Sequence, residues 1–119
     1  MSATGSFSRA DRLIDAEQFR RVFAAARRSR DGHFTVLYCD NTVARPRLGL
    51  AISKKRLRRS VDRNRLKRLV RESFRQHRRS LPAVDLVVMA GPLAEKADNS
   101  AALASLHAHW QKISHVRTQ

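Results

Sequence analysis

The side chains with the clearest chemical potential in this sequence are cations. The chain carries 25 Lys and Arg against 10 Asp and Glu, which gives a formal net charge of +15. Five of these cations are Lys and 20 are Arg. Guanidinium groups present a planar fork of donors that matches phosphate oxygens and stacks on bases. A small domain this basic indicates a polyanionic partner, and the Arg bias favours nucleic acid over a membrane surface.

The excess charge lies in one internal stretch. Residues 45–79 hold 15 basic and two acidic side chains, whereas the segments before and after are close to neutral. A solvated, disordered basic tail is the alternative interpretation, because long blocks of like charge are often disordered. The stretch is internal, however, and it carries a regular apolar pattern. We therefore interpret it as a folded binding surface presented by the rest of the chain.

The basic stretch contains the predicted main helix, residues 61–78. At 100° per residue, Leu66, Leu69, Val70 and Phe74 cluster on one side, so this side would anchor to a core. The opposite side is a ribbon of cations roughly 20 Å long. Backbone N–H groups near the helix start also favour phosphate. The candidate phosphate-binding residues are Lys54, Lys55, Arg58, Arg59, Arg63, Asn64, Arg65, Lys67, Arg68 and Arg71.

The sequence shows no convincing active site made by the protein itself. His107 and His109 are two residues apart, so on a helix they point away from each other and do not suit a zinc site. We expect both to be surface residues. No Gly-rich phosphate loop, Walker motif or Ser/His/Asp arrangement is recognisable. We therefore assign no catalytic residue and no metal ligand.

The apolar periodicity predicts the elements that position these cations. The expected order is helix (15–26), basic connection (27–32), strand (34–39), loop (40–46), strand (47–53), helix (61–78), strand (84–90) and a last helix capped by Asp98 or Asn99. This order is typical of a small α/β fold, an α+β two-layer sandwich with helices packed on a sheet.

The strand at residues 47–53 has two unequal faces. Bulky apolar residues alternate with small ones, and the small ones are Gly49, Ala51 and Ser53. The bulky face belongs to the core. The bare face either sits beneath a close-packed helix or forms a shallow floor on which a ligand can lie, and the sequence leaves both possibilities open.

The chain's 119 residues suit a single domain with its own core. We expect a flexible N-terminus at residues 1–10, the domain at 11–115 and a short tail at 116–119. The single Cys39 cannot form an internal disulfide and is expected to be a small core residue. No apolar run is long enough for a transmembrane helix or a signal peptide. We therefore expect a cytoplasmic protein.

Residues 54–75, KKRLRRSVDRNRLKRLVRESFR, resemble the signature of the bacterial ribonuclease P protein family, with its Arg-Asn-Arg core at residues 63–65. Supporting matches are RLIDAEQFRRVF at residues 12–23, Leu-Gly-Leu at 48–50, Leu-Pro-Ala-Val-Asp at 81–85 and the closing helix. The resemblance covers about residues 9–114. The central motif is specific, and the flanks support it by their order and spacing.

The resemblance implies an α-β-β-β-α-β-α fold with a left-handed crossover between parallel strands, like the second domain of small ribosomal subunit protein five. It implies the ribonuclease P holoenzyme, an endoribonuclease in which the RNA subunit cleaves the phosphodiester with bound Mg²⁺. The implied partners are the catalytic RNA and precursor tRNA, with no membrane and no DNA. The protein alone is expected to be inactive.

The same resemblance implies two binding surfaces. The candidate phosphate-binding residues would contact the RNA subunit. The single-stranded 5′ leader of the precursor would lie in a cleft that uses Phe19, Phe23 and either Phe34 or Tyr38, with the bare strand face around Ser53 as its floor. Aromatic side chains between cations suit single-strand binding. Plain core packing is the alternative for Phe19 and Phe23.

Two other functions compete with this one. A non-catalytic RNA-binding protein, such as a ribosomal protein or an RNA chaperone, would have the same composition, and only the ordered motifs argue against it. A DNA-binding protein would normally show a helix-turn-helix pair, whereas here the basic helix is flanked by predicted strands.

Overall fold

A computed structural model describes residues 12, 15–25 and 27–118. Its elements follow the order α-β-β-β-α-β-α that the resemblance implies. They are α1 (Ala16–Ala25), β1 (Arg27–Arg30), β2 (Phe34–Asp40), β3 (Arg47–Ala51), α2 (Ser60–His77) with the short 3-10 turn η2 (Arg78–Ser80), β4 (Val84–Ala90) and α3 (Asn99–Thr118). The expected flexible segment at 1–10 lies outside the described residues, and α3 continues past residue 115, where we expected the domain to end.

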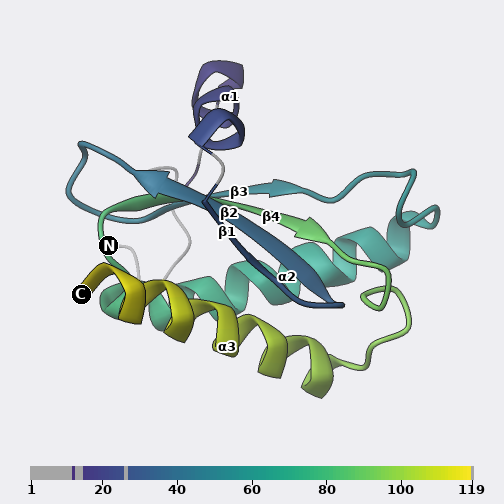
Figure 1. Ribbon diagram of the computed structural model, residues 1–119. Helices are drawn as coiled ribbons and strands as arrows, with labels where there is room; N and C mark the ends of the chain where they lie inside the picture. Colours follow the sequence, from purple (N-terminus) through teal and green to yellow (C-terminus); the bar gives the residue numbers. More distant parts are fainter. Residues whose placement is uncertain (1–11, 13–14, 26, 119) are drawn as a thin grey trace, which may run out of the picture.

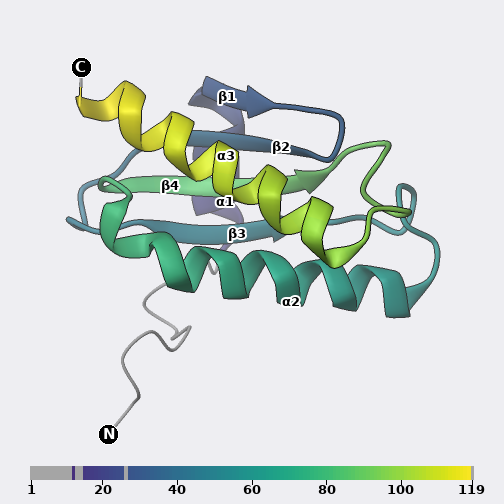
Figure 2. The same cartoon turned by 90° about the horizontal axis from the view of Figure 1, so that it is seen from below.

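The four strands form one mixed sheet in the order β1-β2-β4-β3. β2 pairs antiparallel with β1 and with β4, whereas β3 pairs parallel with β4. Figure 2 views the sheet from the side of α2 and α3, and there the chain leaves β3, returns along α2 and enters β4 as a left-handed crossover. Such connections are right-handed in almost all proteins. The expected fold class is therefore confirmed, including its unusual handedness.

The helices cover the two faces of the sheet unequally. α2 and α3 lie together against one face, which we call the helix-covered face, and α1 alone crosses the opposite face (Figure 1). α1 rests on the two central strands, β2 and β4. Part of that opposite face is left uncovered, and we call it the open face. In the described part of the chain, no helix is both long and apolar enough to cross a membrane.

The main core lies between the sheet and the pair α2 and α3. The apolar stripe predicted for α2 is buried here, including Leu66 and Phe74. Trp110 of α3 packs edge-on against Phe74, with 6.2 Å between the ring centroids. The Trp110 indole N–H donates a 2.8 Å hydrogen bond to the hydroxyl oxygen of Ser73. The one polar atom of this large side chain is thus satisfied inside the core.

A smaller cluster lies beneath α1. Val22 of α1 packs with Leu37 and Val87 from the sheet, and Cys39 joins them. Cys39 is buried and free, as the sequence predicts. Ala51, from the bare side of β3, packs at the edge of this cluster. The small residues of β3 therefore face the side of the sheet on which α1 lies.

Two boundaries differ from the sequence prediction. The basic connection expected at 27–32 contains strand β1, whose Ser29 points inward while its three Arg side chains are exposed. The residues of this segment did not predict a strand, because an edge strand that is held by pairing to β2 does not need apolar residues. β3 ends at Ala51, two residues before the predicted end, since the chain turns at Ser53, whose carbonyl accepts from the N–H of Leu57 at 3.0 Å.

Candidate nucleic-acid interface

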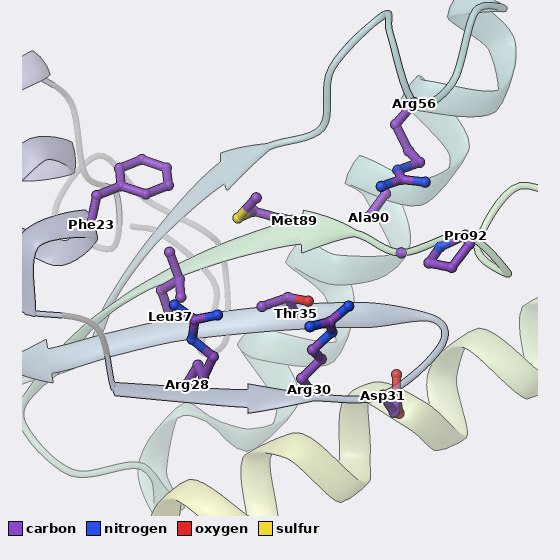
Figure 3. A pocket seen from close by; sticks show the side chains of 11 residues that line it. Phe23, Arg28, Arg30, Asp31, Thr35, Leu37, Arg56, Met89, Ala90 and Pro92 are labelled. Atoms are coloured by element: carbon purple, nitrogen blue, oxygen red, sulfur yellow. The ribbon is translucent and has the colours of Figure 1, made fainter.

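A cleft lies on the open face of the sheet (Figure 3). Its floor is built from Thr35 and Leu37 of β2 and Met89 of β4. Phe23 of α1 forms a wall at one end and is 44% exposed, which is high for a large apolar side chain. The cavity measures about 360 Å³, within the size range of small-ligand sites. The exposed ring of Phe23 is thus available to a bound group.

Cations flank the cleft on both sides. Arg28 and Arg30 project from β1 along one edge, and Arg56 projects from the segment between β3 and α2 along the other (Figure 3). Single-stranded nucleic acids are held by cations along the backbone and by aromatic rings on which bases stack. The cleft combines both groups on a narrow apolar floor. Its chemistry therefore suits a short single strand of nucleic acid.

Among the described residues that line this cleft, Asp31 alone is acidic. Burial by itself raises the pKa of the Asp31 carboxyl group. Hydrogen bonds from the Ser105 hydroxyl and from the backbone N–H groups of Phe34 and His33 outweigh burial and lower that pKa to about 2. The carboxylate therefore stays charged at neutral pH, and its hydrogen bonds tie the turn between β1 and β2 to α3.

His109 lies next to this carboxylate and is buried, so the expectation that it is a surface residue is wrong. His109 lies one helical turn after Ser105 on α3, and both side chains are buried. Its Nδ1 is 2.7 Å from Ser29 Oγ, and its Nε2 is 3.3 Å from Asp31 Oδ2. Ser29 and His109 are only 2% and 3% exposed. A substrate could not reach this Ser-His-Asp series, and its role is to join β1 to α3.

A buried carboxylate holds α1 over the sheet. Asp85 of β4 is fully buried and accepts hydrogen bonds from Arg21 of α1 and, through two contacts of 2.9 Å, from Arg47 of β3. The Asn41 side-chain amide donates a further bond of 2.9 Å. The hydrogen bonds to Asp85 raise the pKa of the Arg47 guanidinium. Because α1 carries Phe23, this network sets the position of the cleft's aromatic wall.

The structure brings only some of the predicted leader-binding residues to the cleft. Phe23 lines it directly. Phe19, one turn earlier, is half-buried and packs against the cluster beneath α1, as the packing alternative expects. Ser53 is exposed and lies with Lys55 in a shallow depression that shares Arg56 with the cleft. Phe23 is thus the aromatic residue of α1 best placed to meet a ligand.

Phe34 and Tyr38, which were expected to contribute to a leader cleft, do not line this cleft. Both belong to the main core on the helix-covered face, together with Val36, which has the same alternation along β2. The intervening residues Thr35 and Leu37 form the cleft floor instead. Both alternating sets in β2 are largely apolar, so the sequence does not reveal which set faces which side.

The cationic ribbon predicted along α2 and the segment before it is accessible to a partner. The exposed members are Lys54, Lys55, Arg58, Arg59, Asn64, Arg68 and Arg71, and the half-buried members are Arg63, Arg65 and Lys67. One acid near the ribbon, Glu72, pairs with Arg75, and its pKa is lowered by the Arg75 hydrogen bond. Cations four residues apart on a helix repel one another by a few tenths of a kcal/mol per pair. A polyanion lying along the ribbon would offset this repulsion.

Two Arg residues of the central motif also hold the protein together. Arg63 Nη1 donates to the backbone carbonyls of Leu57 and Arg58, each at 2.9 Å. Arg65 donates to Asn99 Oδ1 at 2.8 Å and to the Ala97 carbonyl at 3.0 Å. Arg63 thus fixes the loop before α2, and Arg65 fixes the start of α3. Within the described part of the chain, the structure assigns no such internal partner to Arg68.

Sequence reasoning missed most of the cleft. The missed lining residues are Arg28, Arg30, Thr35, Leu37, Arg56 and Met89. The two Arg of β1 were missed because that strand was not recognised. Arg56 lies within the charged run of the sequence. The turn between Ser53 and Leu57 brings Arg56 to the cleft, and the sequence does not predict this position. The alternation of β2 places Thr35 and Leu37 on one face together, but it does not say that this face lines the cleft.

Comparisons with known proteins found relatives by sequence and by structure. The family model described as ribonuclease P matches residues 7–114. The chain is 50% identical over 114 residues to a protein of Thioalkalivibrio sulfidiphilus named ribonuclease P protein component, covering 96% of this chain and 95% of that protein. It is 49% identical over 104 residues to the protein of the same name from Methylococcus capsulatus, covering 87% of this chain and 81% of that one. The solved structure of the Staphylococcus aureus RNase P protein matches with a TM-score of 0.80 at 30% identity, over 87% of this chain and 94% of that one.

Proposed function

The chain belongs to the ribonuclease P protein family, and from this premise we propose that it is the small protein subunit of the ribonuclease P ribonucleoprotein. In this role it binds the catalytic RNA subunit and the 5′ leader of precursor tRNA. It thereby promotes the endonucleolytic removal of the leader that yields the mature 5′ end. The RNA subunit carries out the cleavage, and the protein alone is inactive.

We propose that the RNA subunit binds along the cationic ribbon. The exposed guanidinium groups of Arg68 and Arg71 lie one turn apart on α2, so they can meet successive phosphates. Each neutralised phosphate releases counterions and adds about 0.7–0.9 to the log–log salt slope. Binding should therefore weaken steeply as salt is raised.

The single observation that carries the proposal for the leader is the cleft on the open face. It offers the exposed ring of Phe23 and the apolar floor of Leu37 and Met89 to bases. Arg28 and Arg56, on opposite edges, can follow the phosphate backbone on either side of those bases. Stacking on the exposed ring of Phe23 requires unpaired bases, so the cleft favours the single-stranded part of the precursor.

We propose that the Mg²⁺ needed for cleavage is bound mainly through the RNA subunit. Mg²⁺ prefers carboxylate and water oxygens in octahedral geometry. The carboxylate at the cleft, Asp31, already accepts hydrogen bonds from Ser105 and from two backbone N–H groups. Asp85 is buried among Arg21, Arg47 and Asn41. These donor sets do not fit a Mg²⁺ ion, and we derive no catalytic step through the protein.

The first experiment is cleavage of a precursor tRNA at low Mg²⁺ by a bacterial ribonuclease P RNA, with and without this protein. We expect the protein to restore cleavage at the mature 5′ end and to be inert alone. If it binds the RNA but never promotes cleavage, the chain is instead a non-catalytic RNA-binding protein, such as a ribosomal protein or an RNA chaperone.

A second experiment separates RNA contact from structural support on α2. We expect Arg68→Ala to weaken binding to the RNA subunit and to lower the salt slope by about 0.7–0.9, without changing stability. Arg65→Ala should weaken binding and also lower stability, because the Ala97 carbonyl loses its donor. Filter binding over a salt series, with urea unfolding alongside, distinguishes them. Unchanged RNA affinity in both variants would exclude the ribbon as the RNA-binding surface.

A further inference from the structure

Two histidines meet between the two helices on the helix-covered face. His77 is the last residue of α2, and His107 lies in the third turn of α3. The Nε2 atom of His77 is 2.8 Å from the Nδ1 atom of His107, and the ring centroids are 4.7 Å apart. His107 is exposed and His77 half-buried, so the pair can be reached from solvent. The pair lies across the sheet from the cleft and outside the cationic ribbon.

The surroundings of His77 fix which of its nitrogens carries the proton. Its Nδ1 atom is 2.9 Å from the carbonyl oxygen of Ser73. A carbonyl oxygen only accepts hydrogen bonds, so Nδ1 must be the protonated atom. In the neutral ring, the Nε2 lone pair then points at His107. This is the arrangement of most metal-binding histidines, whose second ring nitrogen donates to a backbone carbonyl or a carboxylate.

The spacing of the two nitrogens suits a shared ion. Bonds of about 2.0–2.1 Å place two adjacent nitrogens on one ion about 3.0 Å apart at a right angle and about 3.4 Å apart at a tetrahedral angle. The observed 2.8 Å is within a few tenths of an ångström of the first value. The ion would lie beside the line between the two nitrogens, because half of 2.8 Å is shorter than a metal–nitrogen bond. Each ring would turn so that its lone pair points at the ion, the hydrogen bond between the rings would be lost, and His107 would carry its proton on Nε2 instead of Nδ1. Both rings stay neutral, and no proton needs to be released.

The space around the pair can admit an ion with its water ligands. An open cavity of about 820 Å³ is lined by both histidines and by the polar side chains of Ser80, Gln111 and Ser114. His115 and the cation Lys112 line other parts of the same cavity. Among the residues that the structure describes, no third His, Cys, Asp or Glu completes a cluster with them. Water must therefore fill the remaining coordination positions, and the bound ion is exchangeable.

We propose that His77 and His107 form a two-histidine site for a divalent transition-metal ion of the class that prefers imidazole nitrogen, namely Ni²⁺, Cu²⁺ or Zn²⁺. The ion joins the end of α2 to the middle of α3 and stabilises their packing, because it binds the folded chain and not the unfolded one. Mg²⁺ prefers oxygen ligands and does not occupy this site. The inference is independent of the proposed RNA-binding function.

The test uses the full chain without an affinity tag, titrated with Ni²⁺ in a calorimeter and then heated with and without Ni²⁺. We expect one saturable site per chain, and a rise in Tm that a chelator reverses and that Mg²⁺ does not produce. His107→Gln should weaken Ni²⁺ binding by roughly tenfold or more, because one of two ligands is lost. The side-chain amide introduced by this substitution could still donate to His77 Nε2, so the contact between the helices survives the change.

His33→Gln is the matched control, because His33 lies in the turn between β1 and β2 and does not line the cavity around the pair. We expect it to bind Ni²⁺ like the unaltered chain. His77→Gln should lose binding as His107→Gln does. The proposal is overturned if the unaltered chain shows no saturable binding. Equal binding by the unaltered chain and His107→Gln would overturn it as well, since the ion would then be held elsewhere.

Discussion

The two faces of the sheet are made by the same strands, yet one face forms the core and the other carries the cleft. On the helix-covered face, alternate residues such as Phe34, Val36 and Val88 are fully buried under α2 and α3. On the open face, their immediate neighbours Thr35 and Met89 are only partly buried and form the floor of a cleft. Strand side chains alternate, so each pair of neighbours divides its roles between stability and binding.

The difference shows how a chain with so much charge can fold. The cations are kept off the helix-covered face, where hydrophobic burial supplies the stability. On the opposite face, beneath α1, the fully buried charge of Asp85 is surrounded by three donors and holds α1 in place. Substitutions on the first face should therefore act on the free energy of unfolding, and substitutions at the cleft should act on ligand affinity.

The largest effect is expected from Trp110→Ala on the helix-covered face. Removing this side chain leaves a cavity beside Phe74 and deprives Ser73 of its donor, so we expect a loss of about 3–5 kcal/mol in the free energy of unfolding. Urea unfolding measures it. Leu103→Ala, on the same helix but 37% exposed, should stay within about 1 kcal/mol. Equal losses in the two variants would mean that Trp110 is not a core residue.

Asp85→Ala tests whether the side of the sheet that carries α1 also contributes to stability. Without the buried carboxylate, the N–H groups of Arg47 and Asn41 would lose their acceptor. We expect the free energy of unfolding to fall by roughly 3 kcal/mol, which is the lower end for a broken buried ion pair, because Arg21 is partly hydrated. Glu17→Ala, which breaks the exposed pair with Arg20, should have almost no effect. If Asp85→Ala unfolds at the urea concentration of the unaltered chain, α1 is held by packing alone.

Phe23→Ala sharpens the comparison most directly, because the residue belongs to the cleft and contributes little to the core. We expect the preference for leader-bearing precursor over mature tRNA to fall by about 1–3 kcal/mol, the value of one stacked base, with stability nearly unchanged. Phe19→Ala should instead lower the free energy of unfolding and weaken the binding of precursor and mature tRNA by the same factor. Competition binding between precursor and mature tRNA measures this preference. If Phe23→Ala weakens the binding of both tRNAs equally, Phe23 does not stack on a leader base.

The smallest effect concerns Asp31, at the turn that joins the two faces. Its pKa of about 2 lies below the ordinary value of 3.8, so its stabilising contribution is complete above about pH 4 and is lost as the pH falls through about 2. The side chain is 38% exposed, and after discounting for solvent screening the contribution is about 1 kcal/mol. The difference in urea midpoint between the unaltered chain and Asp31→Asn should shrink between pH 7 and pH 2. A constant difference would mean that the carboxylate's charge is not involved.

Much of the fold could be predicted from the sequence because its signals are local. The apolar stripe of α2 has one period and one possible partner surface, so Leu66 and Phe74 could be assigned to the core directly. The exposed position of Arg68 followed from the same period. Strand β1 could not be predicted, since its stability comes from pairing with β2 and not from its own composition.

The rest of the site depends on contacts between residues distant in the sequence. The acceptor of Arg65 is a backbone carbonyl at Ala97, and no side-chain pattern marks a carbonyl as a partner. The face on which Phe34 lies was decided by which side of β2 met α2 and α3, and both sides of that strand are apolar enough to be buried. Periodicity can divide a strand into two faces but cannot say where each face will lie.

The strand order has a consequence for how the chain folds. β2 and β3 follow each other in the sequence but never pair; both pair with β4, which comes after the whole of α2. Until residues 84–90 have been synthesised, β1 and β2 can pair, whereas β3 has only the isolated bridge between Leu48 and Arg12. Contacts between such distant residues form slowly, because loop closure costs entropy before the contacts reward it. The four-stranded sheet can therefore be completed only after β4 has been synthesised.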